Sequence, residues 1–341
     1  MRLIGFVLSV AILLSSCKKD PKLFEPVSPM VAGENVLVLN EGNFQWGNAS
    51  TTWINYVKHA TNQDVFANIN GRPLGDVLNS GTQAGGITYL VVNNSQKVER
   101  MKSPLEKAVE PITGMHSPRY VLPINNDKLY ISDLYDNKIY IVNGKSQHTG
   151  FITFPGWSEQ MLVAPDQSVW VCNVTGNSLV RVDTNTDAIV DSIHVGDSPK
   201  SIIIDGNNHL WVLCEGRVFP SETAGSLWCI DLESRSVIQS FTFTSTEHPT
   251  RLHKSADGSV LYYLMNGVRK LNQNDTAAPS SAFIPQGNKL FYGLGVDPQN
   301  HIWVSDAKDF VQNGDVFRYS AEGVLISSFE AGIIPSGFIF Y

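Results

Sequence analysis

The sequence has few cysteines and no concentration of positive charge. Only four of its 341 residues are cysteines. Apart from Cys17, they lie at unrelated positions, Cys172, Cys214 and Cys229, with no C-x-x-C or His/Cys spacing. This pattern predicts buried thiols rather than a disulfide framework or a zinc site. The 25 lysines and arginines are scattered among 32 acidic residues. Because no basic stripe exists, we expect no nucleic-acid partner.

The signatures of several enzyme classes are also missing. The sequence contains no Gly-rich phosphate loop, no nucleophile elbow and no HExxH helix. We therefore expect a binding protein rather than an enzyme, with no catalytic residues, no cofactor and no resident metal.

Long apolar runs are absent except at the start of the chain. Arg2 precedes a run from Leu3 to Leu14 that is apolar except for Ser9, and Ser15-Ser16-Cys17 follows it. The run is too short to span a membrane comfortably, and the small residues before Cys17 form a lipobox. We expect residues 1–17 to be a lipoprotein signal peptide and Cys17 to become the acylated N-terminus. The alternative is an ordinary cleaved signal with an incidental cysteine.

Two further features concern the anchored end of the chain. Lys18 stands where an inner-membrane retention signal usually has Asp, which favours the outer membrane. Residues 18–30 are polar and carry prolines at positions 21, 26 and 29, so they are expected to form a tether. The folded part is then predicted to span residues 31–341, attached to the membrane only through its lipid.

A short aromatic and aliphatic motif recurs along this folded part. The steps between its aromatic residues are 41, 40, 41, 51 and 41, and Leu37 is an earlier member without a ring. Seven units of about forty residues, each with short alternating strands and polar turns, predict an all-β fold, a seven-bladed β-propeller of four-stranded blades. The motif occurs as Tyr89-Leu90-Val91, Tyr130-Ile131, Trp170-Val171, Trp211-Val212, Tyr262-Tyr263 and Trp303-Val304.

The strands of a blade can be read around the motif. In the fourth unit, residues 161–164 are the expected inner strand, 169–172 the second, 179–183 the third and 189–195 the outer strand. The first unit has too little chain before Val36 for an inner strand, whereas the apolar segment 337–341 is left over at the C-terminus. We expect this segment to complete the first blade and close the ring.

The two rims of the predicted disc differ in composition. Turns between the first and second strands are short and consist of common turn residues. The opposite rim, formed where inner strands begin and second strands end, mixes aromatic, amide and charged residues, as a ligand-binding face requires. The candidate ligand-binding residues are Asn40, Phe44, Trp46, Arg119, Tyr135, Trp157, Glu159, Gln160, Asn173, Lys200, Glu215, Arg217, Arg251, Tyr292 and Asp306.

The repeats and the lipobox together resemble the YncE-like seven-bladed propeller lipoproteins, and among them a family of outer-membrane surface lipoproteins from gut-type bacteria. The resemblance covers nearly the whole mature chain. The segments that carry it are Val38-Leu39-Asn40-Glu41-Gly42-Asn43-Phe44, Pro73-Leu74-Gly75-Asp76, Ser117-Pro118-Arg119-Tyr120 and Leu210-Trp211-Val212-Leu213-Cys214-Glu215-Gly216.

That family includes the BtuG-type proteins, which capture cobalamin at the cell surface and pass it to a TonB-dependent transporter. The resemblance implies an outer-membrane, surface-exposed lipoprotein that carries a corrinoid or a similarly bulky ligand. Wide, shallow contact with such a ligand could come from Phe44, Trp46, Tyr135, Trp157 and Tyr292. His116 and His248 are not expected to ligate its cobalt.

Two other readings remain open from the sequence. A metal-dependent hydrolase of the lactonase type would need carboxylates and amides around one cation, and the same rim carries Glu41, Glu159, Asn173, Glu215 and Asp306. A protein-docking or adhesin propeller would instead present a flat apolar patch on that rim.

Overall fold

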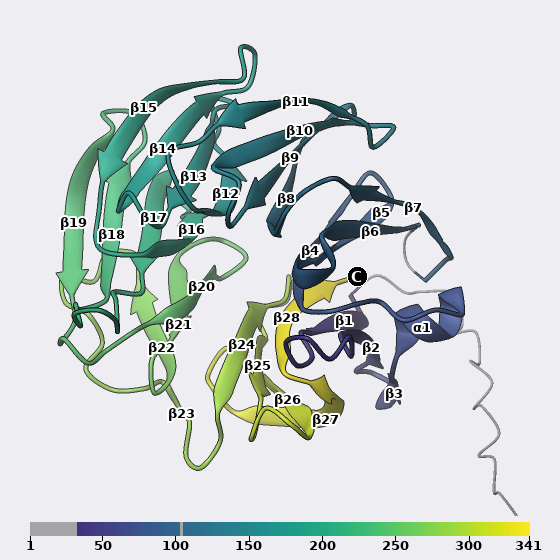
Figure 1. The fold of residues 1–341 in the computed structure, drawn as a ribbon. Helices are drawn as coiled ribbons and strands as arrows, with labels where there is room; N and C mark the ends of the chain where they lie inside the picture. Colours follow the sequence, from purple (N-terminus) through teal and green to yellow (C-terminus); the bar gives the residue numbers. More distant parts are fainter. Residues whose placement is uncertain (1–32, 103–104) are drawn as a thin grey trace, which may run out of the picture.

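Seven four-stranded antiparallel sheets are arranged around a central axis, as the repeat period predicted (Figure 1). The computed structural model describes residues 33–102 and 105–341. The predicted signal peptide, the lipidation at Cys17, the tether and the predicted start of the domain at residue 31 lie outside the described residues. Within the described part, no helix is long and apolar enough to cross a membrane.

Each blade is traced from its inner strand at the axis to its outer strand at the edge. The first blade consists of β28 (Pro335–Phe340), β1 (Asn35–Asn40), β2 (Ser50–Asn55) and β3 (Ala60–Asn62). The second and third are β4 (Leu78–Ala84), β5 (Ile87–Val92), β6 (Lys97–Lys102) and β7 (Ala108–Thr113), then β8 (Pro118–Asn125), β9 (Lys128–Asp133), β10 (Lys138–Asn143) and β11 (His148–Thr153).

The remaining four blades repeat this order. The fourth and fifth are β12 (Ser158–Val163), β13 (Val169–Asn173), β14 (Ser178–Asp183) and β15 (Ala188–His194), then β16 (Pro199–Ile204), β17 (His209–Cys214), β18 (Ser226–Asp231) and β19 (Ser236–Thr242). The sixth and seventh are β20 (Thr250–Lys254), β21 (Val260–Leu264), β22 (Gly267–Asn272) and β23 (Ile284–Pro285), then β24 (Phe291–Val296), β25 (Ile302–Asp306), β26 (Asn313–Tyr319) and β27 (Leu325–Ile333).

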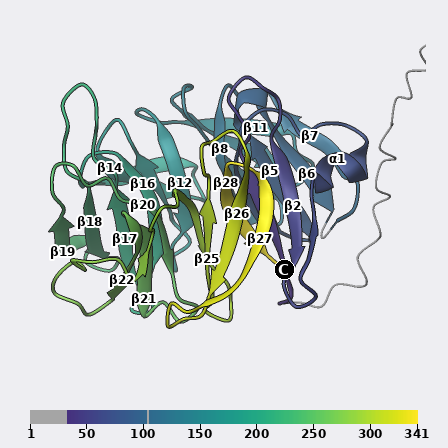
Figure 2. The ribbon, with the colours of Figure 1, turned by 90° about the horizontal axis from the view of Figure 1, so that it is seen from below.

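The C-terminal strand closes the ring, which confirms the predicted closure. β28 pairs antiparallel with β1, with Ile339 opposite Leu37, and Figure 1 shows the yellow C-terminal strand beside the purple β1. β28 also contacts the inner strands β24 and β4 on either side, so the seven inner strands form a continuous ring around the axis. Figure 2 shows the resulting disc from its edge.

The recurring aromatic residues are buried between blades. Trp170, Trp211, Trp303 and Tyr130 are among the largest fully buried side chains. Trp211 packs on Leu252 and other side chains of the sixth blade, and Trp303 packs on the first blade. A large ring on each second strand therefore fills the gap to the next blade, which accounts for the period of the motif.

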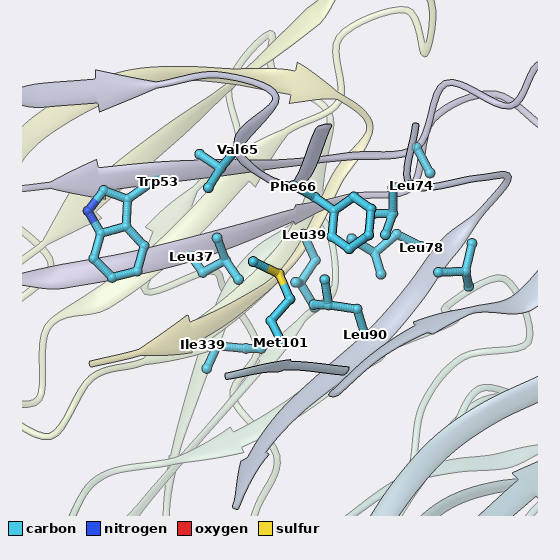
Figure 3. Packing of buried hydrophobic residues seen from close by; sticks show 12 residues of the cluster. Leu37, Leu39, Trp53, Val65, Phe66, Leu74, Leu78, Leu90, Met101 and Ile339 are labelled. Carbon is cyan, nitrogen blue, oxygen red and sulfur yellow. The ribbon is translucent and has the colours of Figure 1, made fainter. Parts of the chain in front are cut away.

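The first and second blades are joined by an inserted segment. It contains a short helix, α1 (Val65–Asn70). A second short helix, the 3-10 helix η1 (Asn93–Ser95), follows β5 in the second blade. Phe66 and Val65 of α1, Leu74 and the β28 residue Ile339 pack in one apolar cluster (Figure 3). The insertion thus thickens the contact at the point where the ring closes.

A buried carboxylate also anchors this insertion. Glu99 on β6 is fully buried and accepts two hydrogen bonds of 2.7 Å from the Arg72 guanidinium and one of 2.6 Å from Lys97 Nζ. Burial would raise the pKa of Glu99, but the hydrogen bonds from Arg72 and Lys97 outweigh it and hold that pKa below its usual range.

Replacement of Glu99 by Gln is therefore expected to destabilise the protein. The substitution removes the counter-charge of Arg72 and Lys97, whose side chains are 40% and 20% exposed and therefore partly solvated. It also replaces charge-assisted hydrogen bonds by weaker bonds to an amide, so the free energy of unfolding should fall by about 2 kcal/mol. Urea denaturation would measure it, with the exposed Glu106→Gln as the control, for which a change within about 0.5 kcal/mol is expected. Equal stability of the two variants would contradict this role.

Candidate functional site

The candidate site is created by a backbone irregularity that all seven inner strands share. In each inner strand the register against its neighbour shifts after the first residue or two, as a β-bulge does. A bulge inserts an unpaired residue and re-aims its side chain. The second residue of each inner strand falls in this irregular stretch. These residues, taken from the second blade around to the first, are Asn79, Arg119, Glu159, Lys200, Arg251, Tyr292 and Ser336.

Six of these seven residues line one cavity at the axis. It has a volume of about 490 Å³ and also receives Glu41 and Glu215 from the loops that follow β1 and β17. We call this cavity the mouth. Inner strands begin here and second strands end here, so the mouth lies on the rim that the sequence predicted as the ligand face.

Three carboxylates and three cations are paired around the mouth. Glu159 Oε1 accepts hydrogen bonds of 2.8 Å from both Arg119 Nε and the Trp157 indole N–H. Lys200 Nζ lies 2.5 Å from Glu215 Oε2. Because the three carboxylates and three cations cancel, the formal charge of the lining is zero.

The third pair is looser and involves a tyrosine. Arg251 Nη2 lies 3.5 Å from Glu41 Oε1, and Tyr292 donates a hydrogen bond of 3.0 Å to Glu41 Oε2. Arg251 Nε donates to the Tyr292 carbonyl at 3.3 Å. Burial lowers the pKa of Arg251, but neighbouring acidic groups, Glu41 among them, outweigh it and raise that pKa, so the guanidinium stays charged.

One half-buried indole lies beside two of the cations. The Arg119 guanidinium is 5.9 Å and the Lys200 ammonium 5.3 Å from the centre of the Trp157 ring. Cations at this distance from the ring of a Trp are held by its quadrupole. The hydrogen bond to Glu159 fixes the other edge of the indole, so Trp157 offers a rigid aromatic surface.

Two tyrosines complete the lining as neutral hydroxyl groups. The pKa of Tyr120 is raised to about 12, mainly by burial and secondly by the negative charge of Glu159. Burial and Glu41 raise the pKa of Tyr292 likewise. Both hydroxyls therefore remain protonated at neutral pH and can donate hydrogen bonds.

The backbone at the mouth holds two residues in the left-handed region. Val77 has φ 60° and Arg251 has φ 59°, and both line the mouth. This conformation is an outlier for a β-branched residue such as Val77, and such strain is concentrated at functional sites.

Below the mouth, the axis of the disc holds two more cavities. An axial cavity of about 240 Å³ shares Asn79, Tyr120, Ser201 and Arg251 with the mouth. A third cavity of about 590 Å³ opens at the opposite rim and shares Thr82 and His253 with the axial cavity. The three cavities therefore adjoin along the axis.

The His253 imidazole faces both lower cavities, and its titration gives a testable pH dependence. Burial and, second, the charge of Arg251 lower the pKa of His253 to about 4 from its usual 6.5. Between these pH values the unfolded chain binds more protons than the folded one, so the free energy of unfolding falls as the pH is lowered from 6.5 to 4.

Between pH 7 and pH 5, the free energy of unfolding of wild type is expected to fall by about 1–2 kcal/mol more than that of His253→Gln. This figure is reduced to allow for solvent in the cavities beside His253. Urea denaturation at pH 7 and pH 5 would measure it, with the exposed His194→Gln as the control. The same pH dependence in His253→Gln and wild type would refute this assignment.

The structure separates the predicted site residues into three groups. Arg119, Glu159, Lys200, Glu215, Arg251 and Tyr292 line the mouth, with Trp157 beside them, and Gln160 lines the axial cavity. On rim loops, Phe44, Trp46 and Tyr135 are 64%, 76% and 64% exposed, and Arg217 pairs with Asp197 at 3.0 Å.

Three predicted residues are buried and bonded within the blades. Asn40 donates to Thr52 and accepts from the Gly332 N–H. Asn173 accepts from the Gly176 N–H, and Asp306 accepts from the Leu290 and Lys308 N–H groups. These polar groups hold the turns that shape the rim, and none of the three lines the mouth.

Several lining residues were absent from the predicted set. Glu41 is predicted on this rim but is not among the candidate ligand-binding residues, and neither are Asn79, Tyr120 and Ser201. A signal for Asn79 was available, since it lies forty residues before Arg119, which lies forty before Glu159. Alignment of the inner-strand starts would have found it.

The mouth has no ready-made cation site. Among the described residues, no group of three or more His, Cys, Asp and Glu could hold a metal ion. Each mouth carboxylate already has a cationic partner.

Comparison with protein families gives one assignment over nearly the whole described chain. The model of a domain of unknown function, DUF5074, matches residues 34–340. The chain belongs to the DUF5074 family. The match includes every strand of the DUF5074 propeller. Comparison of this DUF5074 protein with curated protein sequences gave no match.

Solved structures share the fold of the DUF5074 protein at low identity. A quinonprotein alcohol dehydrogenase-like protein from Bacteroides thetaiotaomicron has a TM-score of 0.70 and 12% identity, covering 91% of this chain and 78% of its own. A provisionally assigned 6-phosphogluconolactonase from Bacteroides fragilis has a TM-score of 0.68 and 13% identity, covering 92% and 100%. Virginiamycin B lyase from Staphylococcus aureus has a TM-score of 0.62 and 13% identity, covering 76% and 87%. At such identities the likeness concerns the fold alone, a β-propeller.

Proposed function

We propose that this DUF5074 protein is an outer-membrane surface lipoprotein that binds cobalamin or a related corrinoid across the mouth and delivers it to a TonB-dependent transporter. The lipobox at Cys17 and the resemblance to BtuG-type proteins support the location and the ligand class. The observation that carries the proposal is the composition of the mouth.

A neutral lining rich in both donors and acceptors suits a large amphipathic ligand. Corrinoids are rigid macrocycles with amide side arms, which need hydrogen-bond donors and acceptors in equal measure. The paired charges of the mouth provide both without a net charge, and Trp157 adds an aromatic surface. A strongly anionic or cationic ligand would gain less from such a lining.

The size of the ligand also agrees with the exposed loops. A cavity of about 490 Å³ is smaller than a corrinoid, so the macrocycle would extend over the rim. Phe44, Trp46 and Tyr135 are exposed on that rim and could contact its outer parts. Aromatic side chains beside a polar cavity provide contact area for an amphipathic ligand.

Protein docking is the second candidate function, because exposed apolar side chains continue away from the mouth. Phe219 is 85% exposed and Val218 71% on the loop after β17. In the capture proposal this surface would face the transporter; in a docking protein it would be the whole binding site. Lactonase-type hydrolysis is less favoured, since the mouth carboxylates are engaged with cations.

Calorimetric titration of the purified full-length protein with cyanocobalamin and cobinamide tests the proposal. One-to-one binding at micromolar ligand or below is expected. If neither compound gives a heat of binding and the protein retains neither of them, corrinoid capture is refuted and protein docking is favoured.

Substitutions at the mouth should weaken this binding. Trp157→Ala removes the aromatic surface and Arg119→Ala removes a donor and frees Glu159, so each is expected to lower the affinity at least tenfold, about 1.4 kcal/mol. Phe151→Ala and Arg235→Ala, both on the outer part of the disc, are the controls and should bind as wild type. Equal affinities in all four variants would place the ligand elsewhere.

A further inference from the structure

The axial cavity differs from the mouth in its charge. Arg251 is its one charged residue at neutral pH, and no carboxylate is among the described residues that line it. The three carboxylates of this region lie in the mouth above. A small cavity with one sign of charge and a surrounding of low dielectric attracts the opposite charge.

Arg251 is only partly neutralised by its partner. The 3.5 Å distance from its Nη2 to Glu41 Oε1 exceeds the 2.7–2.9 Å typical of a charge-assisted hydrogen bond. By contrast, Arg119 lies 2.8 Å from Glu159 and Lys200 lies 2.5 Å from Glu215. Of the three mouth cations, Arg251 is therefore the one whose charge is least neutralised by a carboxylate and most available to a ligand.

Hydrogen-bond donors face the same cavity. Gln160 Oε1 accepts a hydrogen bond of 2.8 Å from the Ile202 N–H, which leaves its Nε2 group as a donor beside the cavity. The His253 ring makes no hydrogen bond to another described residue, and the neutral imidazole carries one N–H. The Tyr120 hydroxyl is a further protonated donor.

We propose that the axial cavity is a subsite for a monoanionic oxyanion, a phosphodiester or carboxylate, carried on a slender arm of the ligand held at the mouth. Arg251 supplies the charge, and Gln160, His253 and Tyr120 supply hydrogen bonds. The volume of about 240 Å³ accommodates such a group but not a macrocycle. The part that concerns the arm rests on the proposed function, and cobalamin, unlike cobinamide, carries a phosphodiester.

The subsite can be tested without any corrinoid. Dimethyl phosphate keeps one negative charge across the accessible pH range, and trimethyl phosphate is its neutral counterpart. In full-length protein with ¹³C-labelled histidine, the His253 signal, identified by its loss in His253→Gln, should shift saturably with dimethyl phosphate at millimolar concentrations and not with trimethyl phosphate. No saturable shift, or equal shifts with both compounds, would overturn the proposal.

A near-isosteric substitution adds a second test. Gln160→Glu retains the acceptor for Ile202 but places a carboxylate at the cavity, so it should weaken dimethyl phosphate binding at least tenfold. Gln147→Glu, on an exposed turn, is the matched control and should bind as wild type. Unchanged binding in a folded Gln160→Glu protein would also overturn the proposal. The comparison of dimethyl phosphate with trimethyl phosphate uses the wild-type protein, so it tests the proposal even if Gln160→Glu does not fold.

The subsite and the proposed function can fail separately. If both hold, Gln160→Glu weakens cobalamin binding much more than cobinamide binding. Binding of dimethyl phosphate without binding of either corrinoid would leave the subsite and refute corrinoid capture. Equal effects of Gln160→Glu on both corrinoids, with no response to dimethyl phosphate, would leave corrinoid capture and refute the subsite.

Discussion

Deletion of residues 335–341 is expected to abolish cooperative folding. The deletion removes β28, which is both the inner strand of the first blade and a member of the inner ring. Ile339 would leave the apolar cluster of Figure 3, and Phe338 and Phe340 would leave their contacts with Trp303. Full burial of three such side chains would contribute roughly 5–9 kcal/mol. Phe338 and Phe340 are only partly buried, so the loss is smaller than this, but it is still comparable to the whole stability of a typical domain.

Circular dichroism and size-exclusion chromatography would measure this outcome. The truncated protein should lose its thermal transition and elute as expanded or associated species, because β1 would expose a free edge. Addition of a synthetic peptide spanning residues 333–341 should restore part of the transition. Ile339→Val keeps the strand and should cost only about 0.5–1.5 kcal/mol. A truncated protein with the wild-type transition would contradict the closure.

The second large effect is expected from Glu159→Gln. Glu159 is 1% exposed and holds both Arg119 and Trp157. The neutral amide leaves a largely buried guanidinium without its counter-charge, so the free energy of unfolding should fall by about 3–5 kcal/mol. Corrinoid affinity should fall as well, because Trp157 and Arg119 lose the group that positions them.

Two further variants separate stability from binding. In Glu159→Gln combined with Arg119→Met, no uncompensated charge remains, so much of the stability should return while the affinity stays low. Glu215→Gln breaks the more exposed Lys200 pair and should cost only about 1 kcal/mol. Urea denaturation and calorimetry would provide both quantities. Wild-type stability and affinity in Glu159→Gln would contradict the described role of the mouth.

The fold was predictable because one class of residue repeats for one physical reason. A large ring is needed wherever a second strand packs on the next blade, so Trp170, Trp211 and Trp303 recur at the period of the blades. The closure was predictable from the number of strands, because the first unit lacks an inner strand and one unassigned apolar segment remains at the C-terminus.

The site was predictable only to the level of a rim. Which rim residue turns toward the axis depends on the bulge in each inner strand, and no single residue type marks that bulge. Polar residues at strand ends were therefore ambiguous. Asn40, Asn173 and Asp306 bond to nearby backbone and side-chain groups within the rim, whereas Arg119 and Arg251 project into the mouth.

The axial histidine was not anticipated at all. His253 lies two residues after Arg251 on the same inner strand, in a stretch without a distinctive sequence pattern. Its role depends on burial and on the charge next to it, and both arise only when seven inner strands meet around one axis.

The most direct test of corrinoid capture is a crystal structure of the protein with cyanocobalamin, with diffraction data collected at the cobalt absorption edge. The anomalous signal locates the metal independently of the fitted ligand. We predict one cobalt position over the mouth, with the corrin ring in contact with Trp157 and the three cations Arg119, Lys200 and Arg251. A cobalt position at the opposite rim, or a mouth without cobalt at saturating ligand, would contradict the proposed function.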